Sequence, residues 1–133
     1  MAGILVIDDD SDTRALLAET LTSAGHQVVV AADGKEGMEQ YRIRPADLVI
    51  TDLYMPIQEG LETIRGLRRN FLEVAIIAMS GKAGAGIMLS IARRLGAIEI
   101  LEKPFHTEEL LAAVEKALRL KSRPYTALEP TAP

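Results

Sequence analysis

The 133-residue sequence contains no cysteine and no tryptophan, and only 4% of its residues are aromatic. Without cysteine, disulfides, zinc–thiolate centres and thiol catalysis are excluded. No apolar run approaches the ~20 residues that a membrane-spanning helix needs, and the first residues lack the regions of a signal peptide. The net charge of −4 is not the basic excess typical of nucleic-acid-binding surfaces. We therefore expect a cytoplasmic protein that binds neither membranes nor nucleic acids directly.

Five short apolar runs, most of them rich in valine and isoleucine, predict strands that are buried on both faces. They span residues 4–7, 27–31, 47–51, 74–79 and 98–101. Helical patterns follow each run, over residues 11–24, 33–42, 60–69 and 83–95 and from a Thr107 cap onwards. This alternation predicts one α/β domain over residues 1–121, with a parallel sheet and helices on both faces. Residues 122–133 hold Pro124, Pro130 and Pro133 and predict a flexible tail.

Chemically reactive side chains follow these predicted strands, at ends that meet on one edge of a parallel sheet. Asp8 and Asp9 close the first strand, Asp52 the third, Ser80 the fourth and Lys103 the fifth. The carboxylates repel one another unless a hard divalent cation such as Mg²⁺ lies among them. The lysine and the serine would then stabilise the oxygens of a phosphoryl group, and aspartate is a known phosphoryl-accepting nucleophile.

These segments resemble the receiver domain of two-component response regulators, of the stand-alone, single-domain type. The resemblance lies in residues 4–10, 47–56 with Gly60, 76–81, and the pairs Gly96-Ala97 and Lys103-Pro104 with the phenylalanine that follows. It extends over about residues 2–121. It implies a flavodoxin-like (βα)5 fold with five parallel strands in the order 2-1-3-4-5. It also implies a cis peptide bond between Lys103 and Pro104.

The resemblance implies a phosphorylation site and a metal site that share one residue. Asp52 would be the phosphoacceptor. Asp8 and Asp9 would hold Mg²⁺, together with the Asp52 carboxylate and the backbone carbonyl of Tyr54.

The resemblance also implies residues that bind the phosphoryl group and respond to it. Ser80 would donate a hydrogen bond to the bound phosphoryl group, and Lys103 would pair with it. Ile100 occupies the switch position, where the family often carries an aromatic ring.

The function implied is that of a phosphoacceptor switch in a two-component or phosphorelay pathway, not that of an enzyme. A sensor histidine kinase or a histidine phosphotransfer protein would donate the phosphoryl group. The domain would assist its own phosphorylation and dephosphorylation. We expect no output domain, so the signal would pass by contact with a downstream protein.

Two other functions stay open at this stage. A small phosphohydrolase of the haloacid dehalogenase type would use Asp8 as nucleophile and Asp10 as acid/base. That motif has threonine or valine four residues after the nucleophile, where this sequence has Asp12. The alternative also leaves Asp52 without a role. The other possibility is a receiver-shaped binding module that is not phosphorylated.

Overall fold

The computed structural model describes residues 2–53, 57–71, 74–81 and 86–121. Five parallel strands form one sheet in the order β2-β1-β3-β4-β5, which confirms the predicted α/β fold and strand order. The strands are β1 (Gly3–Ile7), β2 (Gln27–Ala31), β3 (Leu48–Asp52), β4 (Ala75–Ser80) and β5 (Glu99–Glu102). The helices are α1 (Ser11–Ser23), α2 (Gly34–Ile43), α3 (Ile57–Asn70), α4 (Gly86–Leu95) and α5 (Thr107–Lys121).

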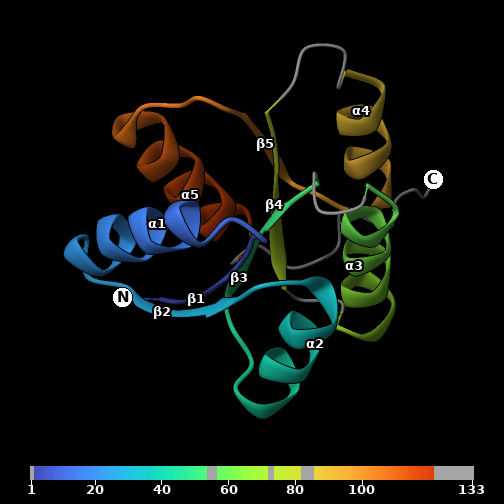
Figure 1. Ribbon diagram of the computed structural model, residues 1–133, viewed down its shortest axis with the longest axis horizontal. Coiled ribbons are helices and arrows are strands. Elements are labelled where there is room, and N and C mark those ends of the chain that lie inside the picture. The colour runs from blue at the N-terminus through green and yellow to red at the C-terminus, as the bar shows by residue number, and fades with distance from the viewer. Residues whose placement is uncertain (1, 54–56, 72–73, 82–85, 122–133) are drawn as a thin grey trace.

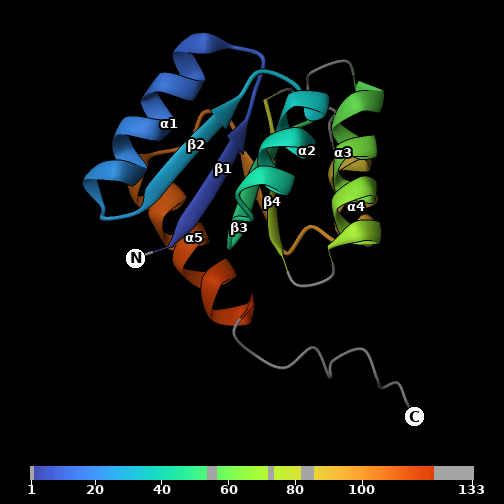
Figure 2. The same ribbon diagram turned by 90° about the horizontal axis from the view of Figure 1, so that it is seen from below.

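The sheet lies between two layers of helices, with α1 and α5 on one face and α2, α3 and α4 on the other (Figures 1 and 2). Each face has its own apolar core, in which Leu17, Leu21 and Val114 pack on the first side and Ile64 and Leu67 on the second. Every residue of the central strands β3 and β4 is buried, whereas the edge strands β2 and β5 are partly exposed. The continuous apolar runs therefore mark the strands that helices cover on both sides.

Local signals explain both ends of α1 and the start of α5. The side chain of Asp10 caps α1 by accepting from the Asp12 N–H, and Gly25 follows that helix with a φ of 98°. The prediction that Thr107 caps α5 is wrong by one residue, because Thr107 is the first helical residue. The backbone N–H of His106 donates to Glu109 Oε1 at 2.8 Å, and its carbonyl accepts from the Glu109 N–H. This reciprocal pair makes His106 the cap.

Helix α3 begins at Ile57, three residues before the predicted start at Gly60. A Cβ built on Gly60 would lie 2.8 Å from Leu53 Cα and 2.9 Å from the Asp52 carbonyl oxygen. The missing side chain therefore lets α3 run directly over the end of β3, where Asp52 stands.

Two further predictions concern the connections and the ends of the chain. The Lys103-Pro104 peptide bond is cis, as expected. Residues 83–85, predicted to start the fourth helix, and the predicted tail over 122–133 lie outside the described residues. Within the part that is described, no helix has both the length and the apolar character needed to cross a bilayer.

Candidate functional site

The carboxyl ends of the strands bring the predicted residues to one edge of the sheet. Ile7 of β1 pairs with Thr51 of β3, so the residues that follow them, Asp8 and Asp52, lie side by side. Ser80 ends β4, and its carbonyl accepts the Lys103 N–H at 2.7 Å. Residues far apart in the sequence thus meet because parallel strands end together.

Lys103 joins the two buried aspartates. Its Nζ donates to Asp8 Oδ2 and to Asp52 Oδ2, at 3.1 Å in each case. The Asp8 side chain is 0% exposed and that of Asp52 4%, while that of Lys103 is 25% exposed. Buried carboxylates require such compensation, because an unpaired charge inside a protein costs several kcal/mol.

The electrostatics of this trio favour a proton or a cation near Asp8. Burial raises the pKa of Asp8 above its usual value, and the Asp52 charge adds to this effect. The Asp10 N–H, which donates to Asp8 Oδ1 at 2.9 Å, and the Lys103 ammonium lower the pKa, but they do not cancel the rise. Burial alone would lower the pKa of Lys103, yet the Asp52 and Asp8 carboxylates outweigh it and raise that pKa.

Three carboxylates form a cluster suited to a divalent cation. Asp8, Asp9 and Asp52 each offer an oxygen, and these oxygens lie within 4.8 Å of one another. Asp9 is exposed, whereas its two neighbours are buried. Three negative charges against the one positive charge of Lys103 leave an excess of negative charge that matches a hard divalent ion with oxygen ligands. The donor set therefore fits Mg²⁺.

Ser80 supplies a buried hydroxyl beside this cluster. The residue is 2% exposed, and its Oγ has no hydrogen-bond partner within the described part of the chain. Buried polar groups nearly always form a hydrogen bond, so a buried hydroxyl without a partner needs an explanation. A ligand oxygen at this edge of the sheet would satisfy it.

The other predicted site residues lie at or near this edge. Ile100 of β5 pairs with Ala78 of β4 and packs against the core on the α2–α4 face. Ser80 lies two residues beyond Ala78, so it points to the same face as Ile100. Tyr54, whose carbonyl is predicted to complete the metal site, lies outside the described residues.

Arg14 is a residue of the site that sequence reasoning missed. Its Nη1 donates to the backbone carbonyl of Asp8 at 2.6 Å, so the guanidinium holds the peptide unit between Asp8 and Asp9. The only signal in the sequence is weak. An arginine one turn into α1 sits near the positive end of the helix dipole, where a cation is disfavoured unless something else holds it.

Asp10 is turned toward α1 and serves that helix. Its carboxylate accepts from Thr13 Oγ1 at 2.7 Å and from the Asp12 N–H at 3.3 Å. The Thr13 hydrogen bond lowers the pKa of Asp10. An aspartate that caps a helix as a stable anion is poorly suited to the acid/base role that the dehalogenase-type alternative gives it. No contact among the described residues of the site favours that alternative.

Comparisons with known proteins agree on the fold. A receiver domain protein from Clostridium thermocellum superimposes with a TM-score of 0.84 at 31% identity, covering 91% of this chain and 97% of the other. The receiver domain of NtrX from Brucella abortus gives a TM-score of 0.82 at 31% identity, covering 87% and 98%. Both are similar over nearly their whole length.

Three curated relatives differ in how much of their own length this chain spans. A probable chemotaxis protein CheY of Rhizobium etli is 35% identical over 115 residues, which cover 84% of this chain and 88% of that protein. Regulatory protein VirG of Agrobacterium fabrum is 37% identical over 118 residues, 89% of this chain. This chain spans only 46% of VirG, and 25% of the transcriptional regulator NtrC of Azospirillum brasilense.

The family model described as the response regulator receiver domain matches residues 4–115. This match runs from the second residue of β1 through β5 and includes Asp8, Asp9, Asp52, Ser80 and Lys103. The chain therefore belongs to the response regulator receiver domain family.

Proposed function

We propose that this chain is a phosphoacceptor switch of a two-component or phosphorelay pathway, and that Asp52 takes the phosphoryl group. The donor would be a sensor histidine kinase or a histidine phosphotransfer protein. As a family, receiver domains are signalling phosphoacceptors, and the proposal brings that role to this chain. We also propose that it acts in the cytoplasm and has no turnover on phosphomonoesters.

One arrangement carries the proposal. The buried Asp52 carboxylate stands 3.1 Å from the Lys103 ammonium, beside Asp8 and near a buried serine hydroxyl that no described group satisfies. Charge compensation alone would explain the lysine but not the orphan hydroxyl. A phosphoryl group on Asp52 accounts for both, since its oxygens accept from an ammonium and from a hydroxyl.

The transfer breaks one bond and forms one. An oxygen of the Asp52 carboxylate attacks the phosphorus of a phosphohistidine in line with the P–N bond, which breaks as the new O–P bond forms. The histidine leaves with the electron pair of the P–N bond. The product is an acyl phosphate on Asp52. Lys103 can then pair with one phosphoryl oxygen, and the Ser80 hydroxyl can donate a hydrogen bond to another.

The acidic cluster would hold Mg²⁺. Asp8, Asp9 and Asp52 offer the carboxylate oxygens, and the resemblance adds the Tyr54 carbonyl. When bound, the ion supplies positive charge that offsets the repulsion among the carboxylates and the phosphoryl oxygens. Arg14 orients the backbone that carries two of these acids.

The switch would act through Ser80 and the face of the sheet that it shares with Ile100. A hydroxyl that turns toward the phosphoryl group changes packing beside Ile100, and phosphorylation then shifts an existing equilibrium between surface conformations. Isoleucine has no ring to rotate, so the change here would be a rotamer shift. A downstream protein would recognise the altered surface.

The test is chemical phosphorylation of the whole chain. Acetyl phosphate with Mg²⁺ should add one phosphoryl group to the wild type, seen by intact mass, and hydroxylamine should remove it because the bond is an acyl phosphate. Asp52→Asn should accept none. Asp12→Asn, at an exposed aspartate in α1, is the matched control and should be labelled like the wild type. Equal labelling of Asp52→Asn and the wild type would reject the proposal.

A further inference from the structure

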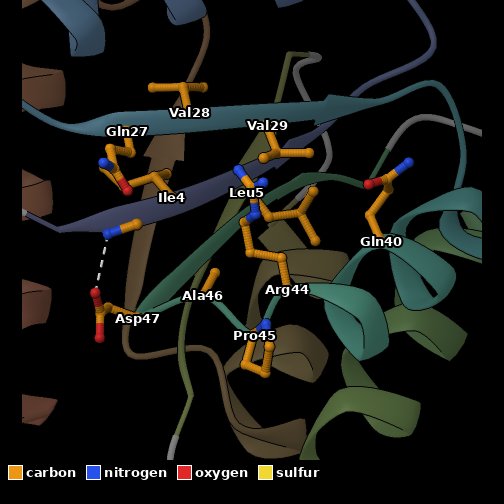
Figure 3. Close-up of a pocket in the computed structure, with 11 residues that line it drawn as sticks. Ile4, Leu5, Gln27, Val28, Val29, Gln40, Arg44, Pro45, Ala46 and Asp47 are labelled. Atoms are coloured by element: carbon orange, nitrogen blue, oxygen red, sulfur yellow. Dashed lines mark hydrogen bonds between the residues drawn. The ribbon is translucent and has the colours of Figure 1, made fainter.

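A hollow of about 190 Å³ lies at the opposite end of the sheet from Asp52. The first residues of β1 and β2 form one wall, and the end of α2 with the segment before β3 forms the other (Figure 3). Leu5, Val29 and Pro45 contribute aliphatic groups to the lining, and polar groups make up about as much of it. The hollow therefore offers apolar contact at the amino ends of the strands, far from the acidic cluster.

Three polar side chains without described partners line this space, namely Gln27, Gln40 and Arg44. Gln40 belongs to α2 and Arg44 follows it; Arg44 extends toward Leu5 and Val29, whereas Gln40 lies at the side of the hollow (Figure 3). Within the described part of the chain, no hydrogen bond or ion pair holds the Arg44 guanidinium or the Gln40 amide. The hollow thus combines apolar walls with an available cation and an available amide.

The remaining charge that lines the hollow is already in use. Asp47 Oδ2 accepts the Gly3 N–H at 2.9 Å, the dashed line in Figure 3, and Asp47 Oδ1 lies 3.7 Å from Lys121 Nζ. This carboxylate is therefore compensated, and the uncompensated charge of the hollow is the positive charge of Arg44.

We propose that this hollow binds a small organic acid, that is, a carboxylate on a short apolar body. The planar guanidinium of Arg44 matches a carboxylate with two parallel hydrogen bonds, and the Gln40 amide can donate a further one. The apolar body would lie against the aliphatic walls. An inorganic oxyanion would fit less well, because one arginine offsets little of its charge and the walls offer it nothing.

The size of the hollow limits the ligand. Typical small-molecule sites measure about 300–1,000 Å³, so a site of about 190 Å³ takes only a fragment-sized molecule. A six-carbon carboxylate is of this class. An affinity on the order of 1 mM is expected for so small a ligand.

Hexanoate is the probe for the test, and the readout is the shift of backbone amide signals in the unphosphorylated full chain. Saturable shifts should gather at Leu5, Val29, Gln40 and Ala46, which line the hollow. Arg44→Gln should weaken binding about tenfold or more, since it removes a charge-assisted hydrogen bond. Arg42→Gln removes an exposed arginine that does not line the hollow, and it should bind hexanoate like the wild type.

Two further probes separate the parts of the ligand, and one variant separates this site from the phosphorylation site. Hexanol, which lacks the carboxylate, and inorganic phosphate, which lacks the apolar body, should each bind at least about tenfold more weakly. Asp52→Asn should bind hexanoate unchanged. Equal loss in both arginine variants, equal binding of hexanol, or shifts centred on the acidic cluster would overturn the proposal.

Discussion

Asp8 is the residue on which the charge balance of the acidic edge depends. It is fully buried, its neighbour Asp52 carries a like charge, and Lys103 is shared between the two. The raised pKa of Asp8 means that its charged form is less stable in the folded chain than in the unfolded chain. The buried acidic cluster therefore lowers the stability of the fold, a cost that proteins often carry at functional sites.

Replacing this residue should stabilise the protein in a pH-dependent way. Because the folded pKa of Asp8 lies above its ordinary value of 3.8, the native state binds more protons than the unfolded state between these two pKa values. The free energy of unfolding of the wild type therefore falls as the pH rises through this window. Asp8→Asn lacks this fall. Without Mg²⁺ it should exceed the wild type by on the order of 1 kcal/mol at neutral pH, and by less in acid.

Urea denaturation of the two proteins from about pH 4 to pH 7 measures this difference. Asp12→Asn, at an exposed position in the same part of the chain, should follow the wild type at each pH. A variant that is less stable than the wild type at neutral pH would show that the pairing of Asp8 with Lys103 outweighs burial.

The reactive residues of this edge could be read from the sequence, but Arg14 could not. Asp8, Asp9, Asp52, Ser80 and Lys103 each follow an apolar run, and the alternation of strands and helices brings such positions together. Arg14 contacts a backbone carbonyl, a group that every residue carries, so no pattern of side chains marks its partner.

At the scale of elements, α3 depends on a single close approach. Gly60 lies where a Cβ would meet backbone atoms of Asp52 and Leu53 at 2.8–3.2 Å. The sequence pattern predicts that the third helix starts at this glycine. It lies inside the helix instead, for a steric reason that involves a different strand. Such non-local causes explain why helix ends are harder to predict than helices themselves.

Two glycines of α3 should respond in opposite directions to alanine. Gly60→Ala should destabilise the protein by about 1–3 kcal/mol, because backbone atoms cannot move aside as a flexible side chain can. At Gly66 the nearest atoms are Cε and Sδ of Met38, at 3.7 and 3.9 Å, which is ordinary contact. Gly66→Ala should therefore stabilise the protein by up to about 1 kcal/mol through helix propensity.

Thermal and urea unfolding of both variants measure whether Gly60→Ala lowers and Gly66→Ala raises the stability of the protein. Gly60→Ala should also lower the rate of labelling by acetyl phosphate, since the added methyl group would displace α3 from the Asp52 backbone. Equal stability of the two variants would mean that α3 shifts freely over the end of β3.

At the scale of the whole molecule, binding of Mg²⁺ should stabilise the entire domain, because Asp8 and Asp9 follow β1 whereas Asp52 ends β3. A ligand that binds only the folded state raises the free energy of unfolding by about 2.7 kcal/mol at a hundred times its dissociation constant. The melting temperature of the wild type should therefore rise with Mg²⁺ concentration.

Asp9→Asn should lose most of this effect, and Asp12→Asn should keep it. Asp9 is the exposed member of the cluster, so its replacement should leave the apo fold intact. If millimolar Mg²⁺ leaves the melting temperature of the wild type unchanged, the alternative of a receiver-shaped binding module that is not phosphorylated would be favoured.

The ammonium of Lys103 reaches two aspartates that lie 95 and 51 positions earlier in the chain. During synthesis, Asp8 and Asp52 leave the ribosome well before the lysine does. A nascent or truncated chain that lacks the fifth strand and Lys103 would carry Asp8 and Asp52 without their shared counter-charge. Phosphorylation of Asp52, as proposed above, is therefore expected to require a chain that extends through Lys103.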